Sequence, residues 1–171
     1  MKLDFERSLT CSFTGHRDIP DAKAAALLEL LFKTIRTLHL ERGYCNFICG
    51  GAVGFDQLAA EAVLAMRALN PDIRLYLILP FPGYDEKWES WQRDARDSLL
   101  READGSTYMT KAHCPGVYYK RDRMLVNLSS VTVAYLHKKR GGTFYTAGYA
   151  FESDHEIINL AKELPGVYNT K

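Results

Sequence analysis

Residues 45–62 read CNFICGGAVGFDQLAAEA and join a short apolar run to a glycine-rich loop and then to a helical pattern. The run Cys45–Cys49 is followed at once by glycine, which is typical of a buried strand. Beyond the loop, apolar residues recur at three- and four-residue intervals from Leu58 to Leu69, and Pro71 ends the pattern. The stretch therefore predicts a strand, a tight loop and a helix, which together are the unit that builds parallel α/β sheets.

The same alternation of short apolar runs and amphipathic patterns extends over the whole chain. Further strands are expected at Leu9–Phe13, Ile73–Leu79, Val131–Leu136 and Ile157–Leu160, with a weaker candidate at Gly105–Met109. Further helices are expected around Leu27–Leu38, Trp88–Leu99, Tyr118–Leu128 and Thr143–Phe151. This order predicts a Rossmann-like, doubly wound α/β fold, with a mainly parallel sheet and helices on both faces, in one domain over residues 1–171.

Composition and charge restrict the class of protein. The 171 residues are 47% hydrophobic and 25% charged, and their net charge is +1. This near-neutral charge argues against a protein that works on nucleic acid. The start of the chain, Met1–Arg7, is too charged for a signal peptide, and no apolar run approaches the roughly 20 residues of a membrane helix. We therefore expect a cytoplasmic protein without membrane contact.

The cysteines give no sign of a metal centre. Four are present, and only Cys45 and Cys49 lie close together in the sequence. No second pair of cysteine or histidine ligands stands at a suitable spacing. Reduced, mostly buried thiols are the expectation, and no metal site is predicted.

Four loops that follow predicted strands carry glycine, proline or basic residues. They are residues 14–17, 50–56, 80–83 and 138–143. Because right-handed crossovers bring all strand-to-helix loops to one edge of the sheet, we expect the four loops to meet there. The carboxyl edge is where doubly wound folds bind their ligands.

The loop at residues 50–56 is the strongest candidate for a phosphate cradle. Glycines at positions 50, 51 and 54 allow backbone amides to approach a ligand, and the next helix offers its positive end. The spacing matches neither the dinucleotide fingerprint nor a Walker loop. A tight turn that only packs the helix against the strand is the alternative interpretation.

Each of the other loop residues has two possible interpretations, one as a ligand-binding residue and one as a purely structural or surface residue. Residues 141–143 (GGT) repeat the glycine turn at a second helix start, where Thr143 either caps the helix or donates to a phosphate. Arg17 either grips a phosphate or is a solvated arginine. His16 either contacts the ligand or satisfies the backbone of its turn. Asp56 either accepts hydrogen bonds from ribose hydroxyls or caps its own helix.

Several motifs together resemble the YpsA-like branch of the SLOG superfamily, which also contains the DNA-processing protein DprA and the LOG phosphoribohydrolases. The similarity runs from about residue 9 to residue 161. The motifs occur in the same order, at Ser12–Arg17, Gly50–Glu61, Leu79–Phe81, Arg121–Leu125 and Gly141–Thr143.

The resemblance implies a Rossmann-like fold in a bacterial protein that binds nucleotides or nucleotide derivatives. It also favours Arg121 and Asn127 as residues of the ligand cleft. In the LOG enzymes, a glutamate at the third position after the Gly-Thr turn carries the catalysis, and Thr146 stands at that place here. A hydroxyl cannot replace the carboxylate. Asp56 and Glu61 are the substitutes near the second loop, and no catalytic residue is assigned.

The sequence therefore favours a sensor or regulatory domain that binds a nucleotide or an ADP-ribose-like ligand. A LOG-like nucleotide hydrolase is the alternative, and a DprA-like binder of single-stranded DNA is the third hypothesis. A protein partner and a homo-oligomer are expected by analogy alone. The residues predicted to bind the ligand are Gly15, His16, Arg17, Gly50, Gly51, Ala52, Gly54, Asp56, Pro80, Phe81, Arg121, Asn127, Gly141, Gly142 and Thr143.

Overall fold

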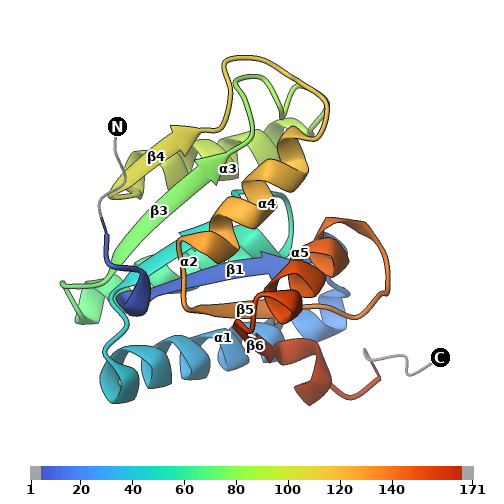
Figure 1. Ribbon diagram of the computed structural model, residues 1–171. Coiled ribbons are helices and arrows are strands. Elements are labelled where there is room, and N and C mark those ends of the chain that lie inside the picture. The colour runs from blue at the N-terminus through green and yellow to red at the C-terminus, as the bar shows by residue number, and fades with distance from the viewer. Residues whose placement is uncertain (1–4, 167–171) are drawn as a thin grey trace.

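The strands of the sheet are all parallel, and β1 lies near the middle (Figure 1). The computed structural model describes residues 5–166. The strand order is β4-β3-β2-β1-β5-β6. In chain order the strands are β1 Thr10–Gly15, β2 Asn46–Cys49, β3 Arg74–Leu79, β4 Gly105–Tyr108, β5 Val131–Tyr135 and β6 Glu156–Asn159. The predicted parallel sheet is confirmed, including β4, the strand with the weakest sequence signal.

Helices cover both faces of this sheet (Figure 1). One face carries α1 (Asp21–Arg42), α2 (Phe55–Leu69) and α3 (Ser90–Glu102), whereas the other carries α4 (Val117–Asn127) and α5 (Gly141–Glu152). Short 3-10 helices cover Arg7–Leu9 and Leu160–Glu163. Within residues 5–166, no helix combines the length and the apolar character needed to cross a membrane.

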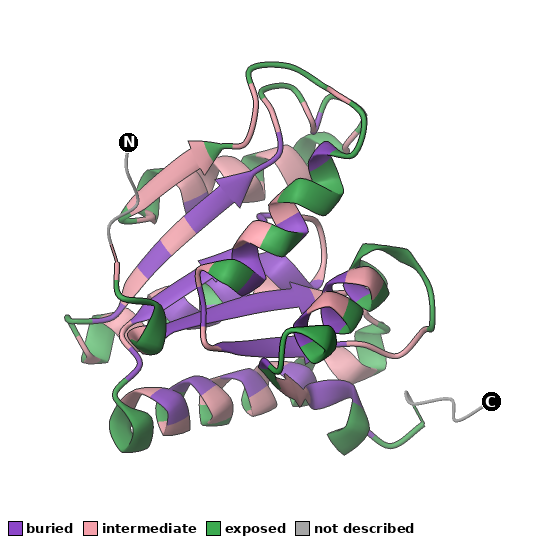
Figure 2. Ribbon diagram, viewed as in Figure 1, coloured by how far each residue is buried: buried purple, intermediate pink, exposed green. Residues whose placement is uncertain are grey.

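The core follows from the apolar stripes of the helices. Leu27, Leu31 and Ile35 recur every four residues along α1 and are fully buried. Because helices cover both faces of the sheet, β1, β2 and β5 are buried over almost their whole length (Figure 2). Cys11 and Cys49 lie in these strands as free, buried thiols.

The chain changes direction across the sheet at β1. From β1 it moves outward through β2 and β3 to β4, and it then returns to β5 on the other side of β1. Such a switch point leaves a crevice outside the carboxyl ends of the two strands. The five glycines expected at the carboxyl edge lie there, so their predicted placement is confirmed: Gly15 ends β1, Gly50 and Gly51 follow β2, and Gly141 and Gly142 follow β5.

Candidate functional site

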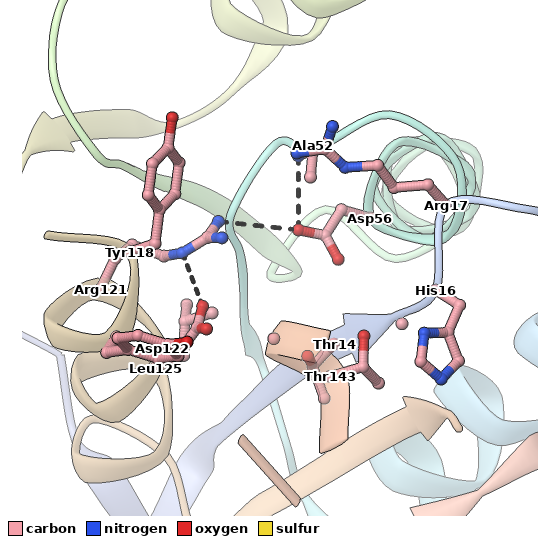
Figure 3. A pocket seen from close by; sticks show the side chains of 13 residues that line it. Thr14, His16, Arg17, Ala52, Asp56, Tyr118, Arg121, Asp122, Leu125 and Thr143 are labelled. Atoms are coloured by element: carbon pink, nitrogen blue, oxygen red, sulfur yellow. Dashed lines mark hydrogen bonds and ion pairs between the residues drawn. The ribbon is translucent and has the colours of Figure 1, made fainter. Parts of the chain in front are cut away.

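A pocket of about 470 Å³ opens at this switch point, between the loops after β1 and β2 and the helices α4 and α5 (Figure 3). Its volume lies within the usual range for small-molecule sites. The residues that line it are Thr14, Gly15, His16, Arg17, Ala52, Asp56, Tyr118, Tyr119, Arg121, Asp122, Leu125, Gly142 and Thr143.

Asp56 organises the glycine loop that leads into α2. Its side chain is buried, and its Oδ2 accepts hydrogen bonds from the backbone N–H groups of Gly50 at 3.1 Å and Ala52 at 3.4 Å. The sequence predicted that amides of this loop would bind a phosphate. In the structure, two of them donate instead to a carboxylate of the protein itself. Since Asp56 also stands in the first turn of α2, its negative charge faces the positive end of that helix.

Arg121 reaches from α4 and lies between two aspartates. Its Nη1 is 3.9 Å from Asp56 Oδ2, and its Nε is 2.9 Å from Asp122 Oδ1 (Figure 3). The arginine side chain is 12% exposed, and the two carboxylates are 7% exposed. Gly50 makes room for this arrangement, because a Cβ there would lie 1.4 Å from Arg121 Nη1. We call Asp56, Arg121 and Asp122 the acidic floor of the pocket.

Burial dominates the electrostatics of the acidic floor. It raises the pKa of Asp56 to about 6, although the Arg121 charge and the two backbone amides act in the opposite direction. Burial also raises the pKa of Asp122, against the attraction of Arg121. The floor thus holds two acceptor groups and one cation. Among residues 5–166, no group of three or more His, Cys, Asp or Glu side chains is arranged to hold a metal ion.

The loop after β1 connects to both neighbouring loops. The backbone N–H of Lys138, in the loop after β5, donates to His16 Nε2 at 3.2 Å. Burial, together with the nearby His137, lowers the pKa of His16, which favours the neutral ring that can accept this hydrogen bond. On the other side, Gly54 packs on the Arg17 backbone, where a Cβ would lie 2.3 Å from the Arg17 carbonyl oxygen. The Arg17 side chain is exposed at the rim of the pocket.

The start of α5 opens into the pocket without a capping side chain. Its Gly142 and Thr143 line the pocket, and the N-cap residue, Arg140, makes no side-chain capping hydrogen bond. No acidic residue stands in the first turn of α5. The first amides of a helix have no acceptor within the helix and carry its positive dipole end. The start of α5 therefore has no carboxylate of its own, unlike the start of α2, although Asp122 of α4 lies close to it, since a Cβ on Gly142 would be 3.3 Å from Asp122 Oδ2.

Two tyrosines of α4 form an aromatic wall, which we define as Tyr118 and Tyr119. Both line the pocket and are partly exposed. Phe81 supports Tyr118 edge-on, with 6.0 Å between ring centroids, and Tyr145 lies 4.5 Å from Tyr119 by the same measure. Such rings offer a surface on which a planar base can stack.

The structure brings eight of the fifteen predicted residues to the pocket. These are Gly15, His16, Arg17, Ala52, Asp56, Arg121, Gly142 and Thr143. The other seven lie outside its lining and are Gly50, Gly51, Gly54, Pro80, Phe81, Asn127 and Gly141.

Several of the residues outside the pocket lining shape the backbone or form hydrogen bonds within the protein. Gly50 and Gly54 permit the close approaches already described, and Gly51 has a φ of +63°, which favours glycine. The Pro80 carbonyl accepts from the Thr110 backbone N–H at 3.1 Å. Asn127 stands at the far end of α4, where its side chain accepts a hydrogen bond from Tyr149.

The residues predicted to bind the ligand did not include Thr14, the two tyrosines, Asp122 and Leu125, which also line the pocket. A helical signal for three of these exists, because Tyr118, Asp122 and Leu125 share the three- and four-residue spacing of one helix face with the predicted Arg121. Of the two acidic substitutes considered earlier, Glu61 is exposed and lies outside the pocket lining. Thr146, for its part, donates its hydroxyl to the Gly142 carbonyl at 2.7 Å.

Known proteins are similar to this chain at low sequence identity. A UPF0398 protein of Staphylococcus haemolyticus is 23% identical over 72% of this chain and 67% of its own length. The SPbeta prophage-derived protein YoqJ of Bacillus subtilis is 25% identical over 78% of this chain and 86% of its own length. The structure of DprA from Streptococcus pneumoniae has a TM-score of 0.61 at 17% identity and covers 86% of this chain. The chain spans about half, 48%, of that DprA structure, and this likeness shows the fold.

The family model described as "YspA SLOG family" matches residues 15–157. The match begins at the end of β1 and extends into β6, so it includes every loop that lines the pocket. The chain therefore belongs to the YspA SLOG family, also written YpsA.

Proposed function

We propose that the pocket binds a phosphorylated, nucleotide-like ligand, and that the protein works as a sensor or regulatory binding domain. The observation that carries the proposal is the uncapped start of α5, where Gly142 and Thr143 line the pocket. A phosphate at that point would accept hydrogen bonds from free amides and would lie at the positive end of the helix.

Basic residues near the rim support an anionic ligand. Arg17 is exposed beside the pocket, and residues 138–140 (KKR) directly precede α5. Lys138 forms an ion pair with Asp18, whereas Lys139 and Arg140 make none of the ion pairs found among residues 5–166. These cations would raise the local concentration of a phosphate compound.

The shape of the pocket supports a nucleoside rather than a bare phosphate. A volume of about 470 Å³ far exceeds the space that one phosphate needs. The aromatic wall of Tyr118 and Tyr119 offers a stacking surface for a base. A nucleotide or an ADP-ribose-like compound combines the anionic and the aromatic part that these two features would recognise.

A matched pair of variants at the start of α5 tests the proposal. Thr143→Asp places a negative charge in the first turn, where Thr143→Asn adds the same shape without the charge. The aspartate should repel a phosphate, so it should weaken the binding of a phosphorylated ligand more than the asparagine does.

The measurement is calorimetric titration with AMP and ADP-ribose, with adenosine as the unphosphorylated control. We expect Thr143→Asp to weaken the two phosphorylated compounds at least tenfold more than Thr143→Asn does. A thermal-shift screen first identifies binders, since a ligand at 100 times its Kd adds about 2.7 kcal/mol of stability. If neither AMP nor ADP-ribose binds the wild-type protein, or if both variants weaken them equally, the proposal is wrong.

A further inference from the structure

We infer that the acidic floor recognises the cis-diol of a ribose, so that the sugar of the ligand lies on Asp56, Arg121 and Asp122 while its phosphate lies at the start of α5. This inference rests on the proposed function and adds the sugar class and the orientation of the ligand.

The floor is unsuited to a phosphate. Its two carboxylates outnumber its single guanidinium, and that guanidinium already faces both of them. The amides of Gly50 and Ala52, which would otherwise attract an anion, donate to Asp56. A phosphate placed here would meet negative charge in a buried setting, where such repulsion is screened least.

The floor does suit neutral groups that donate hydrogen bonds. An ionised carboxylate is an acceptor only, and the floor has two carboxyl side chains, those of Asp56 and Asp122. The hydrogen bonds of Asp56 to the glycine loop and its ion pair with Arg121 all involve Oδ2. The other carboxylate oxygen makes none of these contacts and points toward the side of Thr14 and His16 (Figure 3). This oxygen is available to a donor on the ligand.

Hydroxyl groups match the floor better than amino groups do. A hydroxyl donates and accepts, whereas an ammonium group only donates. The Arg121 guanidinium and the hydroxyls of Thr14 and Thr143 are donors at the same pocket and call for an acceptor on the ligand. Because a carboxylate stands on each side of one guanidinium, the arrangement fits two neighbouring hydroxyls. Carboxylates that bind ribose hydroxyls are an established device of Rossmann-like folds.

The floor and the phosphate end are adjacent, as a sugar phosphate requires. A Cβ built on Gly142 would lie 3.3 Å from Asp122 Oδ2, so the start of α5 directly borders the floor. Asp122 therefore stands where the sugar of a 5′-phosphate would follow its phosphate into the pocket.

The experiment compares ribose and deoxyribose versions of the same phosphorylated compounds by calorimetric titration. The probes are ribose 5-phosphate and AMP, with 2-deoxyribose 5-phosphate and 2′-deoxy-AMP as their matched partners. We expect the wild-type protein to bind each ribose compound about 10- to 150-fold more tightly than its deoxy partner, which is the effect of losing a hydrogen bond to a charged group.

Variants assign this discrimination to the floor. Asp122→Asn and Asp56→Asn keep the side-chain shape and remove the charge, and each should reduce the preference for ribose to within a few fold. Asp94→Asn is the control, because Asp94 is exposed on α3 and lies outside the pocket lining. Thermal melts show whether each variant is folded, and the wild-type comparison does not depend on any variant.

The outcomes separate the two proposals. Equal binding of ribose and deoxyribose compounds by the wild-type protein would overturn the ribose assignment and leave the phosphate site intact. A ribose preference that survives in both floor variants would also overturn it. If no phosphorylated probe binds at all, the proposed function fails and the ribose assignment fails with it.

Discussion

Gly50 and Arg121 fit together so closely that a Cβ at position 50 would lie 1.4 Å from Arg121 Nη1. The guanidinium of Arg121, from α4, thus packs directly against the backbone of the loop after β2. Gly50→Ala should displace the guanidinium and leave two buried carboxylates without their cation. We expect a loss of about 1–3 kcal/mol in the free energy of unfolding, measured by chemical denaturation.

Gly148→Ala is the matched control for that variant. Gly148 lies inside α5, and a Cβ there would meet no atom within 4 Å. Alanine should stabilise the helix by about 0.5–1 kcal/mol, because glycine loses more conformational freedom on folding. A Gly50→Ala protein as stable as the wild type would show that Arg121 has room to move.

Arg17→Ala should weaken phosphorylated ligands and spare the unphosphorylated nucleoside. Arg17 is exposed at the rim, so its removal leaves the fold intact. Loss of a charge-assisted hydrogen bond costs about 1.5–3 kcal/mol, which corresponds to roughly 10- to 150-fold in Kd. Titration with AMP and adenosine measures this difference, and Arg101→Ala, an exposed arginine of α3, is the control. Equal losses for AMP and adenosine would identify Arg17 as a surface residue without a role in binding.

Asp56 should make the protein less stable as the pH rises from about 4 to above 6. Its pKa in the folded state, about 6, exceeds the ordinary value of 3.8, so the folded protein binds the proton more tightly than the unfolded chain does. Stability is therefore lost as the carboxyl group ionises, by up to about 3 kcal/mol from this group alone. Denaturation of the wild type and Asp56→Asn at several pH values isolates the effect. A constant difference in stability between the two proteins from pH 4 to pH 8 would contradict it.

The protein should not release free base from nucleoside monophosphates efficiently. Thr146 supplies no carboxylate at the start of α5, and its hydroxyl is bound to the Gly142 carbonyl. Chromatography of AMP after incubation should show turnover far below the typical enzymatic rate of about 10 per second. Turnover within a few hundredfold of that rate would contradict the prediction, and its loss in Asp122→Asn would then assign it to the floor.

The sheet and its loops were predictable, because in a chain of alternating strands and helices every strand-to-helix loop lies at the carboxyl edge of the sheet. The face of α4 was harder to predict, since residues 120–123 (KRDR) resemble a solvated charge run. Only the docked helix turns Arg121 and Asp122 inward, and it leaves Asn127 outside the pocket. The role of Asp56 could not be derived either. Its bonds to amides four and six residues earlier depend on the path of the loop, which its positive-φ glycines determine.

The pocket takes residues from both helical layers, because Asp56 belongs to α2 and Gly142 to α5 on the opposite face of the sheet. A ligand that contacts both residues would link the two helical layers at the carboxyl edge of the sheet. Occupancy would then slow local opening of α4 and α5, and their backbone amides would exchange hydrogen more slowly.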